Sequence, residues 1–208
     1  MGFIQRSTVG GTSWQEVLNS QVFLNTTEKV YVHFVEVAPS NPNVVYALAS
    51  IQYYHQGILL ISSDGGDTWR ISNTKVDGHG ASMAVDPQDA NTLYVGTWYD
   101  GVYRSQDGGN SFEAINSGLP STSFPFYALA VDPVDTDRVY LGTNSSVFFS
   151  GDKGGHWMKL AEDPIPGNDI WTDGVGTISI DPHHPGYVYV CAKGDAYRLL
   201  GWDPENPQ

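Results

Sequence analysis

Aromatic and acidic side chains gather in several short segments of this 208-residue chain, and they are the residues best suited to hold a ligand. An aromatic ring can stack on the apolar face of a sugar while carboxylates accept its hydroxyl protons, and Tyr and Trp equally anchor protein interfaces. The candidate binding residues are Tyr53, Tyr54, His55, Asp77, His79, Trp98, Tyr99, Asp100, Phe124, Phe126 and Trp171. For any single ring the alternative is a structural role at the centre of the fold. As a group they predict a surface that binds a glycan or a protein.

Two carboxylates offer catalysis as an alternative to simple binding. Hydrolysis of a glycosidic bond needs an acid and a base about 5–10 Å apart. Asp77, Asp100, Asp169 and Asp173 could supply such a pair, and Asp169 or Asp173, in the segment "GNDIWTDG", is its best candidate member. An acidic chain carries many carboxylates on its loops, however, and no spacing in this sequence selects two of them.

The other reactive residue types do not form a recognisable site. His183 and His184 are adjacent, so their side chains point apart on an extended chain, and the acids of "DPVDTD" at 132–137 lack calcium-loop spacing. We expect both groups to be solvated turn residues. No phosphate-binding loop and no Ser/His/Asp nucleophile pattern is present, so neither a metal nor a cofactor is expected. Cys191 is the single cysteine, which excludes an internal disulfide.

Composition argues against some partners and favours one type of secondary structure. The net charge is −13 with only ten Lys and Arg, and a surface this acidic repels nucleic-acid phosphates. No apolar run approaches the roughly 18 residues that span a bilayer, and the first residues lack the apolar core of a signal peptide. The 23 glycines, 12 prolines and 12% aromatic residues favour short strands joined by turns.

A recurring octet indicates how these residues are positioned. "SSDGGDTW" at 62–69 is followed by "SQDGGNSF" at 105–112 and "SGDKGGHW" at 150–157, and a weaker copy, "STVGGTSW", stands at 7–14. A second motif recurs with the same period. It consists of an apolar segment interrupted by a proline turn, and its four prolines, Pro39, Pro87, Pro133 and Pro182, are 46 to 49 residues apart. Such a period indicates a repeat architecture.

Each repeat contains four antiparallel strands, which we call A to D. Strands A and B form a hairpin around the proline turn, strand C follows, and the octet turns the chain into strand D. This pattern predicts an all-β protein, a β-propeller of four-stranded antiparallel blades, with about four blades in the chain. The prediction is one domain over residues 1–208, with repeats at roughly 1–20 (partial), 31–75, 80–117, 125–163 and 175–201 (partial).

The strand count leaves ring closure open. The chain begins inside one blade and ends inside another, so the N-terminal strand D could join the C-terminal strands A to C and close four blades. The favoured alternative is a partial ring, or one completed by self-association with a second copy. In either case the A–B turns and the octets share one side of the propeller. The B–C and D–A loops, which carry the candidate binding residues, share the other.

The residues that recur from octet to octet are expected to be structural. Its aspartates can accept backbone hydrogen bonds, its glycines suit a positive φ, and its final aromatic ring can wedge between blades. These residues are Ser62, Asp64, Gly66, Trp69, Ser105, Asp107, Gly109, Phe112, Ser150, Asp152, Gly154 and Trp157.

The octet resembles the Asp-box, also called the BNR repeat, with the pattern Ser-x-Asp-x-Gly-x-Thr-Trp. "SSDGGDTW" matches every fixed position, "SGDKGGHW" departs at His156, "SQDGGNSF" departs at Ser111 and Phe112, and "STVGGTSW" has Val9 in place of the aspartate. The resemblance covers essentially the whole chain. It implies a β-propeller similar to those of sialidases, xyloglucan-degrading glycosidases, sortilin-type receptors and photosystem II assembly factors.

The resemblance does not select one activity. Sialidases need three arginines that converge on a substrate carboxylate, and none of the five arginines here lies in the variable loops. Photosystem assembly factors use a basic patch, which disagrees with this acidic chain. The expected function is therefore a non-catalytic interaction module for a protein or glycan, with a xyloglucanase-like glycoside hydrolase as the alternative. Many relatives act outside the cytoplasm, so the resemblance favours an extracytoplasmic location.

Overall fold

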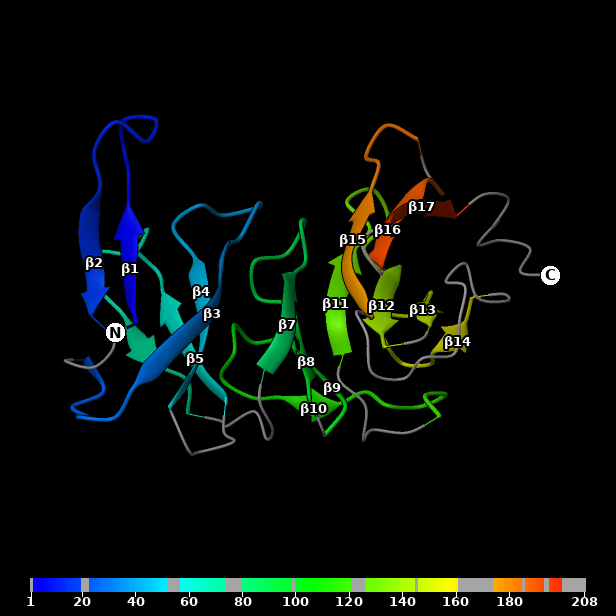
Figure 1. Ribbon diagram of the computed structural model, residues 1–208, viewed down its shortest axis with the longest axis horizontal. Helices are drawn as coiled ribbons and strands as arrows, with labels where there is room; N and C mark the ends of the chain where they lie inside the picture. The colour runs from blue at the N-terminus through cyan, green and yellow to red at the C-terminus, as the bar shows by residue number, and fades with distance from the viewer. Residues whose placement is uncertain are drawn as a thin grey trace.

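The computed structural model describes residues 2–19, 23–51, 57–73, 80–98, 100–120, 126–144, 146–160, 174–184, 186–192 and 195–199. These residues form 17 strands arranged in five antiparallel sheets, each built from strands consecutive in the chain (Figure 1). The predicted all-β propeller fold is confirmed. None of the described segments forms a helix with the length and apolar character that a membrane crossing requires.

The five sheets are called blades 1 to 5 in chain order. Blade 1 contains β1 (Phe3–Arg6) and β2 (Gln15–Asn19), and blade 2 contains β3 (Val30–Val37), β4 (Val45–Ile51), β5 (Gly57–Ser62) and β6 (Arg70–Ile71). Blade 3 contains β7 (Gly80–Val85), β8 (Leu93–Thr97), β9 (Val102–Ser105) and β10 (Glu113–Ala114). Blade 4 contains β11 (Phe126–Val131), β12 (Val139–Thr143), β13 (Val147–Ser150) and β14 (Met158–Lys159). Blade 5 contains β15 (Val175–Ile180), β16 (Val188–Ala192) and β17 (Asp195–Leu199).

The blades stand one after another along an open arc (Figure 1). Blade 1 and blade 5 lie at opposite ends of this arc. Among the described strands, β2 pairs with β1 and β17 pairs with β16, so β2 does not complete blade 5. The arrangement is a partial propeller, and the alternative of a closed four-blade ring is not observed.

The core consists of apolar layers between neighbouring blades. Leu48 and Leu59 of blade 2 pack with Leu93 and Val95 of blade 3, and similar layers join blades 3 and 4 and blades 4 and 5. Blade 1 packs on blade 2 through Ile4 and Leu18 among others. The central strands are covered on both faces, which explains why segments such as "VYLGT" are almost continuously apolar. Full burial of each such aliphatic side chain stabilises the fold by about 1.5–3 kcal/mol.

The A–B turns and the octets lie on one side of the propeller, as strand alternation predicts. The backbone N–H of Gly65 donates to Asn43 O at 2.8 Å, and Lys153 N–H donates to Asp137 O at 2.9 Å. Each bond joins the octet of a blade to the A–B turn of the same blade. We call this the turn side and the opposite one, with the B–C and D–A connections, the loop side.

The three octets that contain an aspartate share a set of hydrogen bonds between the serine hydroxyl, the carboxylate and the turn backbone. In the octet at residues 62–69, the Ser62 hydroxyl donates to Asp64 Oδ1 at 2.8 Å and accepts from the N–H of Gly66 at 2.8 Å. The Thr68 hydroxyl and the N–H of Thr68 both donate to the Asp64 carboxylate, and these bonds lower the pKa of Asp64 to about 2. Gly66 has a φ of 97°, a conformation that favours glycine. The octet carboxylate therefore serves to hold its own turn.

The other two complete octets repeat this network. The hydroxyls of Ser105 and Ser150 donate to the octet carboxylates of Asp107 and Asp152. Hydrogen bonds from Ser111 lower the pKa of Asp107 to about 2. The turn glycines Gly109 and Gly154 have φ values of 78° and 86°.

Candidate functional site

The structure describes three of the sequence-predicted binding residues. Trp98 and Asp100 lie in the B–C loop of blade 3, and Phe126 begins β11. The remaining candidates lie outside the described residues: Tyr53, Tyr54, His55, Asp77, His79, Tyr99, Phe124 and Trp171, together with the catalytic candidates Asp169 and Asp173.

Trp98 forms a ring pair with a residue of the next blade. Its indole meets the ring of Tyr127, on β11, edge to face, with centroids 5.7 Å apart and planes at 79°. Trp98 is 38% exposed and Tyr127 is partly buried, so the pair presents aromatic surface at the junction of blades 3 and 4. The chain separates the two residues by 29 positions, and sequence reasoning did not select Tyr127. The alternation of residues along β11 could have identified Tyr127, because regular alternation places Tyr127 on the opposite face of the strand from its neighbours Phe126 and Ala128, both of which are buried.

A tight loop fixes the position of Trp98. The buried Thr97 hydroxyl donates to Gly101 O at 2.9 Å and accepts from the N–H of Asp100 at 2.9 Å. Thr97 N–H also donates to Gly101 O, which closes the loop. The same device recurs in blade 4, where the Thr143 hydroxyl donates to Ser146 O and accepts from Ser146 N–H. Asp100 is exposed and follows Trp98 by two residues in this loop.

The backbone of blade 5 also approaches the ring pair. A Cβ placed on Gly174, just before β15, would lie 3.0 Å from Tyr127 Cδ2 and 2.6 Å from Asn144 Cα. The start of β15 and the B–C loop of blade 4 therefore converge on Tyr127. We define the Trp98–Tyr127 site as Trp98, Asp100, Tyr127, Asn144 and Gly174. It combines the ring pair with the backbone of Asn144 and Gly174, and the exposed Asp100 follows Trp98 by two residues in the same loop.

Phe126 does not belong to this surface, which corrects the prediction that it is a loop ring available to a partner. It is 1% exposed and packs with residues of blades 3 and 4. Its carbonyl oxygen accepts a 2.7 Å hydrogen bond from the Ser82 hydroxyl of the neighbouring blade. A ring buried to this extent contributes to the core and cannot contact a ligand.

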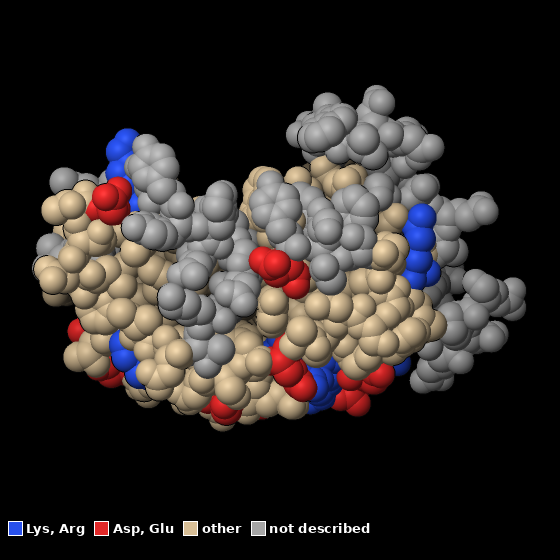
Figure 2. Space-filling view, turned by 90° about the horizontal axis from the view of Figure 1, so that it is seen from below, with Lys and Arg blue, Asp and Glu red and all other residues tan. Residues whose placement is uncertain are grey.

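The arginines make structural contacts on the turn side. Arg6 donates to Gly65 O of the next blade at 2.7 Å, and Arg104 makes the equivalent bond to Lys153 O at 2.8 Å. Arg138 pairs with Asp135 within its own turn. These contacts place the three arginines away from the Trp98–Tyr127 site. Figure 2 shows acidic and basic side chains interspersed on the described surface seen from below, without a continuous basic patch.

The turn aspartates considered as metal ligands have another role. Asp132 is buried, not solvated as expected, and its Oδ1 accepts from the N–H groups of Val134 and Asp135. Asp86 caps the corresponding turn of blade 3 in the same way. His184 pairs with Asp181 at 2.8 Å. The described part of the chain contains no group of three or more His, Cys, Asp or Glu side chains arranged to hold a metal ion.

A shallow cavity of about 330 Å³ lies on the turn side of blade 3, away from the Trp98–Tyr127 site. Its lining includes Arg104, Asp107 and Glu113, and Arg104 Nε donates to Glu113 at 2.9 Å. The polar groups of this cavity are thus engaged with one another or with their own octet. The cavity offers no set of groups aimed at a ligand.

Comparison with known proteins supports the fold. No protein-family model matches the chain. The xyloglucanase of Hypocrea jecorina (strain QM6a) is 32% identical over 96 residues, which cover 40% of this chain and 12% of the relative. Xyloglucanase Xgh74A of Acetivibrio thermocellus is 32% identical over 99 residues, covering 41% and 12%. The matched region therefore spans about an eighth of each relative.

Solved structures share the fold over more of the chain. A GH74 enzyme of Niastella koreensis superposes with a TM-score of 0.64 at 21% identity, covering 82% of this chain and 28% of that one. YCF48 from Cyanidioschyzon merolae has a TM-score of 0.64 at 13% identity, covering 94% and 62%. The chain thus has a propeller fold shared with GH74 enzymes and YCF48, and part of its sequence is similar to xyloglucanases.

Proposed function

We propose that this chain is a glycan-binding propeller module and that the Trp98–Tyr127 site forms part of its binding surface. The observation that carries the proposal is the exposed indole of Trp98, held by the Thr97 loop and by Tyr127 at a blade junction. A fixed ring loses little conformational entropy when a ligand stacks on it. The exposed Asp100 and the amide of Asn144 can exchange hydrogen bonds with sugar hydroxyls.

A substituted β-glucan is the ligand class that we propose. Support comes from the sequence similarity to two proteins named as xyloglucanases. The similarity covers about 40% of this chain and 12% of each enzyme, so it supports a ligand class and not the complete activity of those enzymes. The loop-side candidates outside the described residues, especially Tyr53, Tyr54 and Trp171, would extend the surface along a polymer.

We also propose that the octets are Asp-boxes, with the chain a single Asp-box propeller domain. The repeated Ser–Asp–Gly hydrogen bonds of three octets support this assignment. An extracytoplasmic location would follow from the same resemblance.

Calorimetric titration with xyloglucan oligosaccharides tests the proposed function. Trp98→Ala removes the exposed ring, and we expect it to weaken binding about tenfold or more, equivalent to about 1.4 kcal/mol. Trp14→Ala is the matched control, because Trp14 is an exposed indole of an octet, on the turn side. Equal affinities of the two variants, with both folded by circular dichroism, would contradict the proposal.

Glycoside hydrolysis is the second candidate function, favoured by the names of the similar proteins. Asp169 and Asp173 would then act as general acid and base. Release of reducing ends from xyloglucan measures this activity. Asp173→Asn should abolish hydrolysis while oligosaccharide binding persists. Binding without any hydrolysis by the wild-type chain would contradict the glycosidase function and favour the non-catalytic one.

A further inference from the structure

The first strands of blades 2 to 5 share an irregularity that the sequence patterns did not predict. In each of these strands, β3, β7, β11 and β15, the register of pairing with the following strand shifts near the loop side. Such a shift is a β-bulge, which inserts one extra residue into one strand of a pair. The bulge residues are His33, Ala81, Tyr127 and Gly176, and each stands six residues before the turn proline of its repeat.

The bulge turns its residue out of both faces of the blade. Phe126 packs toward blade 3 and Ala128 toward blade 5, although the two neighbours of one residue in a regular strand share a face. Tyr127 stands between them and belongs to neither of the two apolar layers among the described residues. The residues that flank His33 divide in the same way between blades 1 and 3. A bulge residue is therefore directed to the edge of its sheet and to neither neighbouring blade.

The four strands that carry the bulges stand side by side along the arc. β3 contacts β7, β7 contacts β11 and β11 contacts β15, as Figure 1 shows. Each is an edge strand of its own sheet. We call the four bulge positions the bulge row. Because Tyr127 is the bulge residue of blade 4, the Trp98–Tyr127 site occupies one place in this row.

The side chain at the bulge differs from blade to blade, whereas the strand that follows it is uniform. The second and fourth residues after the bulge are apolar in all four blades: Val35 and Val37, Met83 and Val85, Leu129 and Val131, and Ile178 and Ile180. The bulge positions themselves carry His, Ala, Tyr and Gly. A common backbone device with a different side chain in each blade indicates a role other than packing. Bulges are frequent beside binding sites because they re-aim a side chain.

His33 is the other ring-bearing residue of the bulge row. It is exposed, and its Nε2 lies 2.7 Å from the hydroxyl oxygen of the buried Ser50. Its ring stacks on Tyr31, with centroids 6.4 Å apart and planes at 25°. A hydrogen bond and a ring contact thus hold the imidazole in place. An imidazole held in this way can exchange hydrogen bonds with sugar hydroxyls at a small cost in conformational entropy.

We propose that the bulge row binds an extended glycan and that His33 contacts it. The inference rests on the proposed glycan-binding function of the Trp98–Tyr127 site. A polysaccharide bound at Tyr127 continues across β7 toward β3 and reaches His33. The opposite direction leads to Gly176, which offers no side chain to a ligand. Contacts on successive blades suit a polymer because both the ligand and the blades repeat.

Calorimetric titration with xyloglucan oligosaccharides of increasing length tests the proposal. The affinity of the wild-type chain should increase once the oligosaccharide is long enough to reach from blade 4 to blade 2. His33→Ala should weaken binding of the longest oligosaccharide by about three- to tenfold, the effect of one lost hydrogen bond, and leave the shortest unaffected. Trp98→Ala should weaken binding of both.

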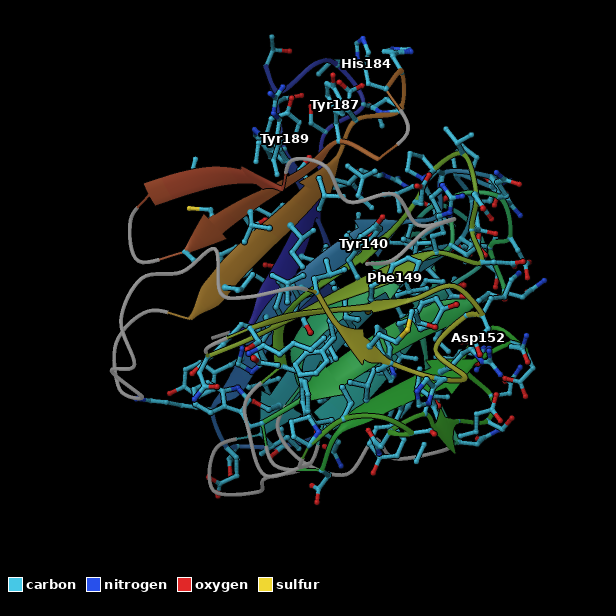
Figure 3. All side chains as sticks on the ribbon, turned by 90° about the vertical axis from the view of Figure 1, so that its right-hand side faces the viewer. Tyr140, Phe149, Asp152, His184, Tyr187 and Tyr189 are labelled. Carbon is cyan, nitrogen blue, oxygen red and sulfur yellow. The ribbon has the colours of Figure 1, made fainter. Side chains whose placement is uncertain are left out.

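His184→Ala is the matched control for His33→Ala. His184 is also exposed and also stacks on a tyrosine, Tyr187, with ring centroids 5.3 Å apart. It lies in the A–B turn of blade 5, and Figure 3 shows it with Tyr187 at the end of the molecule, apart from Tyr140 and Phe149. His184→Ala should bind oligosaccharides of every length as the wild-type chain does.

NMR spectroscopy of the wild-type chain gives a test that is independent of the folding of any variant. The imidazole resonances of His33 should shift when the longest oligosaccharide is added and stay unchanged with the shortest. Resonances of His33 that do not respond to any bound oligosaccharide would overturn the role of the bulge row. Binding that Trp98→Ala weakens and His33→Ala leaves unchanged would overturn that role alone. A wild-type chain that binds no oligosaccharide would overturn the proposed function, and this inference with it.

Discussion

The indole Nε1 of Trp157 donates a 2.6 Å hydrogen bond to the carbonyl oxygen of Ile115, which lies in the preceding blade. Trp157 is 1% exposed and packs with blade 3 although it belongs to blade 4. The octet therefore ends in a residue that stabilises a neighbouring blade through both packing and a hydrogen bond. The equivalent Trp14 in the weaker octet is 62% exposed and bonds only within its own turn, to Gly11 O.

Replacement of Trp157 by Phe should destabilise the fold through that carbonyl. The phenyl ring keeps much of the packing but leaves Ile115 O without the indole donor, at a cost of about 1–3 kcal/mol in the free energy of unfolding. Trp14→Phe, the matched change at an exposed site, should change it by less than about 0.5 kcal/mol. Urea unfolding followed by circular dichroism measures both, and equal effects would contradict a special role for the buried indole.

The octet serines should differ in importance according to burial. Ser150 is fully buried, donates to Asp152 at 2.6 Å and accepts from Gly154 N–H at 2.8 Å. Ser150→Ala leaves that N–H unsatisfied, so we expect a loss of about 1–3 kcal/mol of stability. Ser7→Ala removes the equivalent acceptor for Gly11 N–H, but water can replace it because that turn is exposed. A loss in Ser7→Ala as large as in Ser150→Ala would show that burial does not decide the effect.

Gly142 should be intolerant of any side chain because blade 5 packs against it. A Cβ at this position would lie 2.7 Å from Val175 Cβ and 3.1 Å from Ala128 Cβ. Gly142→Ala should therefore cost about 1–3 kcal/mol by overpacking the junction of blades 4 and 5. At Gly176 the nearest atom to a new Cβ is Cys191 O at 3.9 Å, so Gly176→Ala serves as the control. Thermal unfolding should lower the midpoint for the first variant and leave it within error for the second.

Glu36 should make stability depend on pH near neutrality. Burial at the junction of blades 2 and 3 raises the pKa of its carboxyl from 4.5 to about 7, although a hydrogen bond from the Val85 backbone acts in the opposite direction. The folded state therefore holds a proton between pH 4.5 and 7 that the unfolded state releases. Stability from this group is fully present below pH 4.5 and is lost as pH rises through about 7.

Glu36→Gln should remove that loss. At pH 8 the variant should be more stable than the wild-type chain by about 1–3 kcal/mol, and at pH 4 the two should be similar. Glu16→Gln, at an exposed position, is the control for a lost carboxylate. Unfolding midpoints measured across this pH range would refute the assignment if the wild-type chain and Glu36→Gln followed parallel curves.

The sequence by itself determined the fold class, the blade repeat and the two sides of the propeller. These depend on local features: the period of the octets, the alternation of apolar residues and the proline turns, all of which act within about one repeat. The octet network is also local, since Ser62 and Asp64 bond within four residues of themselves. Such features can be recognised in a sequence because they depend only on residues that lie close together in the chain.

Only the tertiary structure decided which of the equivalent residues are buried. Tyr140 and Tyr189 occupy the same position in their repeats, yet one is buried and the other 41% exposed, because blade 5 covers the first and no described blade covers the second. The same limit applies to Phe126, which burial removed from the candidate site, and to Tyr127, which packing against Trp98 added to it. Burial and ring contacts between blades depend on residues distant in the chain, and a local pattern carries no information about them.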